Sequence, residues 1–306
     1  MSIENSAPLF YNYWPQILAL VVVYFSAVYF INLKNPDKKS ESDNKEKSKQ
    51  NLKKKYQTPD REAEVNEDDF VEDNAMMASA LPDDLHHIPL TTYKRYSEQE
   101  MIKRSVAFYE EMNNRRTLRF YSQEDVPKEV IENIIKAGGT SPSGAHTEPW
   151  TFACISDKSL KQSIRKVIEN EEEVNYKKRM GKQWTSDLRP LRTDWHKEYL
   201  TDAPYLILVF KQVYGFNPEN PEKRINHYYN EESVCIATGI LLAAIQHAGL
   251  VTLTSTPLNC GPALRTLLGR PKNEKLEILL PVGYPAHGAT VPDLKRKKLN
   301  EISVWL

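Results

Sequence analysis

The chain has 306 residues, enough for one large domain or two ordinary ones, and 40% of them are hydrophobic, which excludes a wholly disordered protein. Basic and acidic residues number 41 each, so the formal net charge is zero and no global field attracts nucleic acid. The three cysteines show no CxxC or other metal-ligand spacing, which favours reduced, buried thiols in a cytosolic setting.

An apolar segment near the N-terminus predicts a transmembrane helix at 15–33, after a short segment at 1–14. The run PQILALVVVYFSAVYFINL has no charged residue, and roughly 20 helical residues cross the hydrocarbon core of a bilayer. A cleaved signal peptide and a buried core helix are the alternatives, but the only charge before the run is Glu4, whereas a signal peptide begins with basic residues. Lysines follow the run at Lys34, Lys38 and Lys39. We therefore expect a single-pass plasma or vesicle membrane protein with its N-terminus outside and its main domain in the cytosol.

Residues 34–82 are predicted to form a charged, disordered tether. The stretch KKSESDNKEKSKQNLKKK contains almost no large apolar residues, so it cannot bury enough surface to offset its chain entropy. The remaining residues, 83–306, form the predicted catalytic domain.

That domain contains predicted helices and strands in mixed order. Helical spacing or capping patterns occur at 97–115, with Ser97 as N-cap, and at 127–139, 160–180, 192–200 and 230–250. Strand patterns occur at 150–156, 203–212 and 274–285. This order is neither a regular β-α alternation nor all-β, so we predict an α+β fold. The helix at 230–250 is apolar on most faces, which predicts burial in the core or at a subunit interface.

A cluster of arginines in RRTLRF follows the first of these helices. Arg115, Arg116 and Arg119 carry guanidinium forks that match phosphate oxygens, and the Thr117 hydroxyl could complete a phosphate site. The alternative is a solvated or ion-paired face, and the basic run at 295–298 is equally ambiguous.

Several familiar motifs are absent from the sequence. No P-loop, no GxGxxG after a strand, no HExxH and no GxSxG occurs. Rossmann-type nucleotide binding and metal catalysis are therefore disfavoured, no metal site is expected, and a hydrolase is a weak option.

Three polar residues have a spacing that suits an amino-acid ligand. Glu172 and Tyr176 are four residues apart and share a helix face, and Lys197 lies in the next predicted helix. An acid, a phenol and an amine could bracket a zwitterion, although charges on an exposed acidic helix are the plainer reading. Two further segments stand out: the small, rigid turn TSPSGAHTEPW at 140–150, and TLTSTPLNCG, in which Thr254, Ser255 and Thr256 precede a proline.

Together these segments resemble the nitroreductase superfamily of flavoproteins, and within it the iodotyrosine deiodinase family. The resemblance rests on SPSGAHTEPW, EEEVNYKKRMG, HYYNEES, TPLNCGPALRTLLGRP and ATVPDLKRK, and covers nearly the whole chain from about Arg115 onward. It implies a nitroreductase-like FMN-binding fold and an obligate, domain-swapped homodimer with the flavin at the subunit interface. The implied activity is FMN-dependent reductive dehalogenation of 3-iodotyrosine and 3,5-diiodotyrosine, with NADPH as ultimate electron donor through a separate reductase.

The resemblance also implies residue roles. The FMN phosphate and polar edge are assigned to Arg115, Arg116, Thr117, Arg119 and Arg296. Ser143, Gly144, Thr254, Ser255 and Thr256 are assigned to the flavin ring, with Thr256 donating to flavin N5. The Ala145 N–H is assigned to the substrate phenolate, and Glu172, Tyr176 and Lys197 to its ammonium and carboxylate. Thr117, Leu118 and Ser255 depart from the commonest family residues. Two rival functions remain: a membrane-anchored general nitroreductase or quinone reductase, which needs no amino-acid clamp, and a halotyrosine-binding protein without turnover.

Overall fold

The structure is a computed structural model of the chain and describes residues 77–306. The predicted transmembrane helix at 15–33 and most of the predicted tether at 34–82 lie outside the described residues. Among residues 77–306, no helix combines the length and the apolar composition that crossing a bilayer requires.

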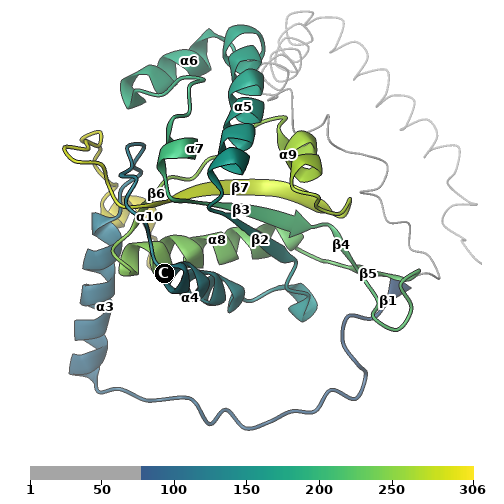
Figure 1. Cartoon of the computed structure of the whole chain (residues 1–306). Coiled ribbons are helices and arrows are strands. Elements are labelled where there is room, and N and C mark those ends of the chain that lie inside the picture. The colour runs from purple at the N-terminus through teal and green to yellow at the C-terminus, as the bar shows by residue number, and fades with distance from the viewer. Residues whose placement is uncertain (1–76) are drawn as a thin grey trace, which may run out of the picture. The chain divides into compact units, whose positions relative to one another are not determined.

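The centre of the described part is a four-stranded antiparallel sheet. Its order is β2-β3-β7-β6, formed by β2 (Trp150–Ile155), β3 (Tyr205–Gln212), β7 (Glu274–Gly283) and β6 (Val251–Thr252) (Figure 1). All three predicted strands are present. The antiparallel pairing confirms the α+β class, because parallel crossovers would be needed for a doubly wound fold.

Helices cover both faces of this sheet (Figure 1). One face carries α4 (Lys128–Gly139) and α8 (Asn230–His247), and the other carries α5 (Lys158–Val174), α7 (Tyr199–Asp202) and α9 (Gly261–Leu267). Alternate residues of β3 therefore enter two cores: Leu208 and Phe210 pack on the α5 side, and Ile207 and Val209 on the α4 and α8 side. A strand covered on both faces reads as a continuous apolar run, as YLILVF does.

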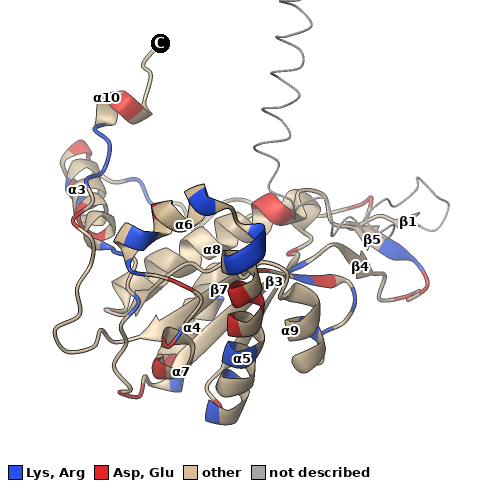
Figure 2. Ribbon diagram, turned by 90° about the horizontal axis from the view of Figure 1, so that it is seen from above, with Lys and Arg blue, Asp and Glu red and all other residues tan. Residues whose placement is uncertain are grey.

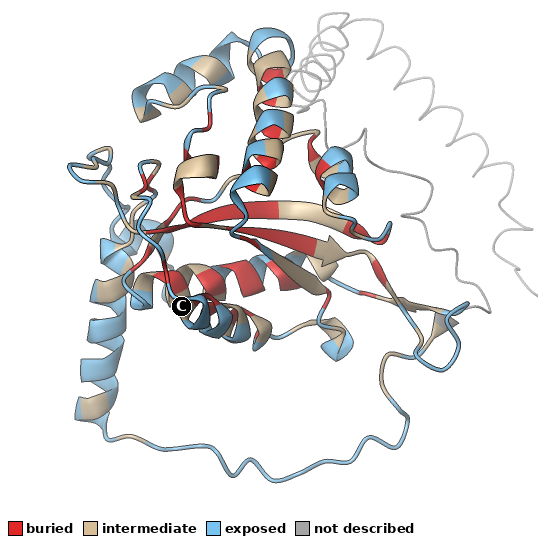
Figure 3. Ribbon diagram, in the orientation of Figure 1, coloured by how far each residue is buried: buried red, intermediate tan, exposed pale blue. Residues whose placement is uncertain are grey.

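The long helix α3 (Glu98–Asn114) stands apart from this core. It begins at the predicted cap, where the Ser97 hydroxyl accepts from the Glu100 N–H at 3.3 Å, and none of its residues is buried. Its exposed apolar side chains are Met101, Ile102, Val106, Phe108 and Tyr109. The C-terminal segment with α10 (Leu299–Ile302) is also exposed, including Val304 and Trp305 (Figure 3). Both ends of the domain thus leave large apolar groups uncovered within one chain.

A second, small sheet has the order β1-β5-β4, from β1 (Met77–Ala78), β5 (Arg224–Asn226) and β4 (Tyr214–Phe216). In β1, Met77 pairs with Arg224 and Ala78 with Ile225. The described strand β1 thus lies in residues predicted to belong to the tether.

The segment after α5 forms a cap of short helices. A π-helix at Asn175–Arg179 is followed by α6 (Lys182–Leu188) and a 3₁₀ turn at Arg189–Leu191. The predicted helix at 192–200 is wrong for 192–198, since only Tyr199–Asp202 is helical. Arg192 has a left-handed φ of 51°, and the Asp194 carboxylate accepts the His196 N–H at 2.7 Å, so a side chain replaces helical bonding there.

Candidate functional site: a cationic cavity beside an ion-paired clamp

The arginine segment lies beside the short edge strand β6. Thr117 forms an isolated parallel bridge with Thr252, and the Leu118 N–H donates to the Thr252 carbonyl at 3.2 Å. Leu118 is buried, whereas Thr117 is exposed and Arg119 is half-buried. This extended backbone turns the arginine side chains away from the apolar core.

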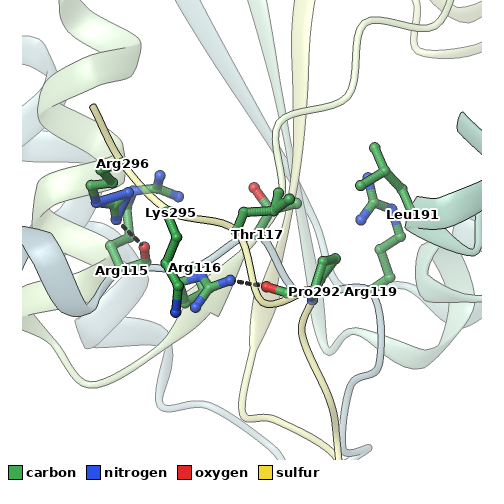
Figure 4. A pocket seen from close by; sticks show the side chains of 9 residues that line it. Arg115, Arg116, Thr117, Arg119, Leu191, Pro292, Lys295 and Arg296 are labelled. Atoms are coloured by element: carbon green, nitrogen blue, oxygen red, sulfur yellow. Dashed lines mark hydrogen bonds between the residues drawn. The ribbon is translucent and has the colours of Figure 1, made fainter. Parts of the chain in front are cut away.

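These side chains line a cavity of about 280 Å³ (Figure 4). Its wall consists of Arg115, Arg116, Thr117, Arg119, Leu191, Pro292, Leu294, Lys295 and Arg296. Five of these nine residues are basic and none is acidic. The structure therefore brings together all five residues to which the phosphate of the cofactor is assigned, although Arg296 lies 181 positions after Arg115 in the sequence.

Backbone carbonyls hold the cations of this cavity in place. Arg116 donates to the Pro292 carbonyl, and Arg296 Nη2 donates to the carbonyls of Arg115 at 2.8 Å and Asn113 at 3.1 Å. Burial lowers the pKa of Arg115, and the neighbouring Arg296 and Arg116 lower it further. Like charges gathered this closely are stabilised by an anion, and a phosphate matches both their charge and their donor geometry.

A second cavity of about 290 Å³ adjoins the first and shares Thr117, Arg119, Leu191 and Pro292 with it. Its other walls are Phe120, Pro190, Arg192, Thr290 and Val291, so apolar groups predominate. A cationic cavity next to a mainly apolar cavity suits a ligand with a phosphate at one end and a flat ring at the other.

The three predicted clamp residues meet at the C-terminal end of α5. Glu172 and Lys197 are both buried, and the Lys197 ammonium lies 3.6 Å from the Glu172 carboxylate. The same ammonium lies 5.4 Å from the centre of the Tyr176 ring and donates to the Asp194 carbonyl. Trp195 packs edge-on against Tyr176, at 6.1 Å between ring centres. The structure thus places the acid, the phenol and the amine around one point.

The clamp has an unusual electrostatic environment. Burial lowers the pKa of Lys197, whereas the carboxylates of Glu172 and Asp194 act in the opposite direction. Burial also raises the pKa of Tyr176, with Glu172 as the next cause. Arg119 of the cationic cavity acts on the pKa of both Lys197 and Tyr176, so the cavity and the clamp are electrostatic neighbours.

Thr254, Ser255 and Thr256 extend from the end of β6. Ser255 pairs with Leu279 through two backbone hydrogen bonds of 3.0 and 2.8 Å, which leaves Thr254 and Thr256 exposed on either side. The Ser255 side chain is hydrogen-bonded to Tyr199, whose pKa is raised to about 12 mainly by burial. Because Tyr199 follows Lys197 closely in the chain, this bond connects the hydroxyl segment to the clamp segment.

The turn after α4 is tightly built. Ala145, His146 and Glu148 all have left-handed φ angles between 45° and 52°, which are uncommon for residues other than glycine. The Ser143 hydroxyl accepts the Glu148 N–H at 3.0 Å across the turn. A Cβ on Gly144 would lie 2.6 Å from the Tyr228 carbonyl oxygen, so this position requires glycine. The first N–H of this turn to donate within it is that of His146, which bonds to the Ser143 carbonyl. The N–H groups of Gly144 and Ala145 precede it, at the N-terminal end of the turn, where N–H groups have no partner within the turn.

This turn and the arginine segment lie at opposite corners of the sheet within one chain. The turn leads into Trp150, which pairs with Lys211 on β3, whereas Thr252 pairs with Val282, whose β3 partner is Tyr205. Six residues of β3 span about 20 Å, and the outer strands β2 and β6 are about 14 Å apart across the sheet. A single chain therefore does not bring Ser143, Gly144 and Ala145 to the cationic cavity.

The structure also places residues at the site to which the sequence assigned no role. Leu191 and Pro292 line both cavities, and Lys295 lines the first. Only Lys295 had a signal, as part of the ambiguous basic run. Asn175 is fully buried beside the clamp, where its amide donates to Glu172 at 3.3 Å and to the Leu258 carbonyl at 3.4 Å.

The fold and the site together define an α+β protein with a cationic cavity that suits a phosphate. Residues 112–284 match a family model, that of the nitroreductase family. The chain is 61% identical over 238 residues to the mouse iodotyrosine deiodinase 1, covering 78% of this chain and 82% of that protein. It is 51% identical over 302 residues to the iodotyrosine deiodinase of Daphnia pulex, covering 98% of this chain and 99% of that protein.

A solved structure also matches. The crystal structure of an oxidised iodotyrosine deiodinase bound to FMN and 3-iodo-L-tyrosine superposes with a TM-score of 0.54 at 31% sequence identity, covering 63% of this chain and 96% of that one. The chain belongs to the nitroreductase family and, within it, to the iodotyrosine deiodinases.

Proposed function

We propose that this chain is an FMN-dependent dehalogenase that converts 3-iodotyrosine and 3,5-diiodotyrosine to tyrosine and iodide. The observation that carries the proposal is the buried Glu172–Lys197 pair with Tyr176 beside it, next to a cavity lined by five cations. A general nitroaromatic or quinone reductase has no use for two buried, opposite charges, since its substrates carry no amino-acid group. The relatives named iodotyrosine deiodinase support the same reading.

FMN fits the residues of the cationic cavity. Arg115, Arg116, Arg119 and Arg296 can hold the phosphate, with the Thr117 hydroxyl as a further donor. The adjoining apolar walls, Phe120, Leu191 and Pro292 among them, can hold the ring. In this assignment Thr254, Ser255 and Thr256 run beside the ring, and Thr256 donates to its N5 position.

The clamp can recognise both charges of an amino acid. Glu172 and Lys197 neutralise each other at 3.6 Å, so an entering zwitterion exchanges one ion pair for two: its ammonium pairs with Glu172 and its carboxylate with Lys197. Tyr176 borders the same space. This exchange keeps both buried charges compensated, and it fixes the direction in which the substrate's ring points.

Reduction of an aryl–iodine bond consumes two electrons and one proton, breaks the carbon–iodine bond, forms a carbon–hydrogen bond and releases iodide. Reduced FMN, when bound, supplies the two electrons. The chain's own residues orient the ring of the substrate through the clamp, and the Ala145 N–H, at the open end of its turn, donates to the phenolate oxygen. A donor placed at a developing negative charge in a water-excluded site stabilises the transition state.

The active form is proposed to be a homodimer. The turn that carries Ser143, Gly144 and Ala145 lies about 20 Å along and about 14 Å across the sheet from the arginine segment, so a second copy is needed to supply it. Apolar positions that are exposed or half-buried offer the contact surface: the outer face of α8 with Ile236, Gly239 and Ala243, and the uncovered α3 and C-terminal segment. Burying these groups between two copies removes apolar area from water.

Membrane attachment is a further proposal, supported by the uncharged run at 15–33 and the lysines that follow it. It places the catalytic domain in the cytosol, where NADPH, acting through a reductase partner, is the proposed electron source. Protease added to sealed vesicles whose cytosolic face is outside should digest the catalytic domain. Protection of that domain from the protease would show the opposite orientation.

The function is tested anaerobically. The FMN-loaded protein from residue 77 onward is reduced with dithionite, one equivalent of 3-iodotyrosine is added, and flavin reoxidation and tyrosine are measured. Stoichiometric reoxidation with release of tyrosine and iodide is expected. Reduced flavin that ignores 3-iodotyrosine but is oxidised by a nitroaromatic would replace this function with general reduction, and halotyrosine binding without reoxidation would leave a binding protein.

A further inference from the structure

One face of α5 is hydrogen-bonded to the segment that carries Lys197. Lys161, Arg165 and Glu169 are spaced four residues apart, so they form a stripe along the helix. Basic residues lie in the first part of α5 and acidic residues in the second part (Figure 2). Each of the three side chains bonds to a group between residues 197 and 204, and the same helix carries Glu172 near its end.

Glu169 makes the contact closest to the clamp. Its Oε1 accepts the backbone N–H of Lys197 at 2.6 Å and a bond from Arg165 Nε at 2.8 Å. Arg165 in turn donates from Nη1 to the Thr201 hydroxyl at 2.9 Å. The Glu169–Arg165 pair is three-quarters buried, so solvent screens it less than an exposed pair.

Lys161 anchors the other end of the segment. Its buried ammonium donates to the carbonyls of Ala203 at 2.6 Å, Pro204 at 3.3 Å and Thr201 at 3.4 Å. These carbonyls lie where α7 ends and β3 begins, so the segment is held between Glu169 at its start and Lys161 at its end.

This bonding matters because residues 192–198 are not helical and the Lys197 backbone is not fixed by an intrahelical ladder. We propose that Glu169 is a positioning residue for substrate binding: by accepting the Lys197 N–H, it fixes the root of the Lys197 side chain and directs the ammonium toward Glu172 and the substrate carboxylate. The inference rests on the proposed function, because it gives a role to a residue behind the proposed clamp.

The test is a double-mutant cycle on FMN-loaded protein, with the dissociation constant of 3-iodotyrosine measured by quenching of flavin fluorescence. Glu169→Ala should raise the constant about tenfold, whereas Glu169→Gln, which retains an acceptor oxygen, should raise it by about threefold or less. In a Lys197→Ala background, Glu169→Ala should add less than about a twofold effect, because the residue that it positions is gone.

Controls separate positioning from general damage. Reoxidation of reduced flavin by a nitroaromatic should be equal in wild type and Glu169→Ala, since that reaction does not use the clamp. Glu132→Ala, which removes an exposed carboxylate paired with Lys128 on α4, should change neither quantity.

Two results would overturn the inference: additive effects of Glu169→Ala and Lys197→Ala, or a Glu169→Gln protein that binds as weakly as Glu169→Ala. A wild-type protein that binds no halotyrosine would overturn the proposed function, and the positioning role with it. A wild type that binds tightly while Glu169→Ala binds equally well would overturn the positioning role alone.

Discussion

The clamp and the turn at 143–148 are two parts of one proposed site, and they are built in opposite ways. The clamp is complete within one chain, because Glu172 and Lys197 pair with each other. Glu169 accepts the Lys197 backbone N–H, and the Asn175 amide donates to Glu172. The turn is closed by local hydrogen bonds, carries three left-handed residues, and lies at the far corner of the sheet. In the proposed dimer, the clamp half of the site would form when the chain folds, and the turn half would come from the second chain.

Breaking the association should have the largest effect. Ile236→Asp places a charge on the exposed apolar face of α8. We expect a monomer that loses FMN and all dehalogenase activity while keeping its clamp, because burying an unpaired carboxylate at an interface is strongly unfavourable. Sedimentation velocity and flavin absorbance measure the two losses. Leu267→Asp on α9 should remain dimeric, and a dimeric Ile236→Asp protein would refute the assignment of this face.

Removing one phosphate ligand should have the next largest effect. Arg116→Ala deletes a guanidinium from the cationic cavity. A hydrogen bond to a charged group contributes about 1.5–3 kcal/mol, so the affinity for FMN should fall about 10- to 100-fold. Fluorescence titration of the apoprotein with FMN gives the constant. Lys128→Ala, at an exposed pair on α4, should bind FMN normally; equal affinity in Arg116→Ala would place the phosphate elsewhere.

A change in the clamp should leave the dimer and its FMN intact. Lys197→Ala should raise the dissociation constant of 3-iodotyrosine by about tenfold or more, on the same figure for a charged hydrogen bond. Flavin content and oligomeric state should not change. If the constant is also unchanged, Lys197 is not part of the clamp.

The clamp also predicts a pH dependence. Burial lowers the pKa of Lys197, so its ammonium loses its proton at a lower pH than an exposed lysine does. Affinity contributed by this charge is fully present below the lowered pKa and is lost as the pH rises through it. Lys197→Arg should keep its charge and flatten that limb of the binding profile; an identical alkaline limb in both proteins would assign it to another group.

The hydroxyl segment should affect chemistry more than binding. Thr256→Ala is expected to slow reoxidation by 3-iodotyrosine several-fold relative to reoxidation by a nitroaromatic, because it removes the proposed donor to flavin N5. Stopped-flow absorbance under anaerobic conditions gives both rates. Thr256→Ser should restore the wild-type ratio, and an unchanged ratio in Thr256→Ala would remove Thr256 from this role.

The smallest effect is expected for a change at the start of the exposed helix α3. Ser97→Ala removes the N-cap of α3, which typically costs about 1 kcal/mol. Because α3 buries none of its residues within the chain, the loss should appear in the stability of the dimer, measured by urea unfolding at several protein concentrations. Ser105→Ala on the same helix should be neutral or slightly stabilising, since alanine has the higher helix propensity. Equal losses in both variants would contradict a capping effect.

Local patterns predicted those features that depend on local physics. The spacing of Glu172 and Tyr176 indicated a shared helix face, and the apolar run in β3 indicated a buried strand. The helix predicted at 192–200 was mostly wrong because Asp194 satisfies a backbone N–H with its side chain, which a periodicity argument does not detect. The grouping of Lys197 with Glu172 came from the resemblance rather than from that spacing.

Features set by long-range pairing could not be predicted from spacing. Nothing in RRTLRF indicates that Pro292 and Arg296 complete its cavity, because that contact depends on where the chain returns after β7. The left-handed conformation of Ala145 also has no signal in residue type, since alanine rarely adopts it. The corner-to-corner placement of the turn follows only from the register of β2, β3 and β7.

The 3.6 Å pairing of Glu172 with Lys197 also bears on which molecules the site rejects. A tyramine brings an ammonium without a carboxylate, and a hydroxyphenyl acid brings a carboxylate without an ammonium. Either one, on entering, would separate the pair and leave one buried ion with no counter-charge, a situation that costs several kcal/mol. The site therefore discriminates against analogues with only one of the two charged groups, because each of them leaves either Glu172 or Lys197 buried without a counter-charge. This discrimination needs no steric barrier at the entrance.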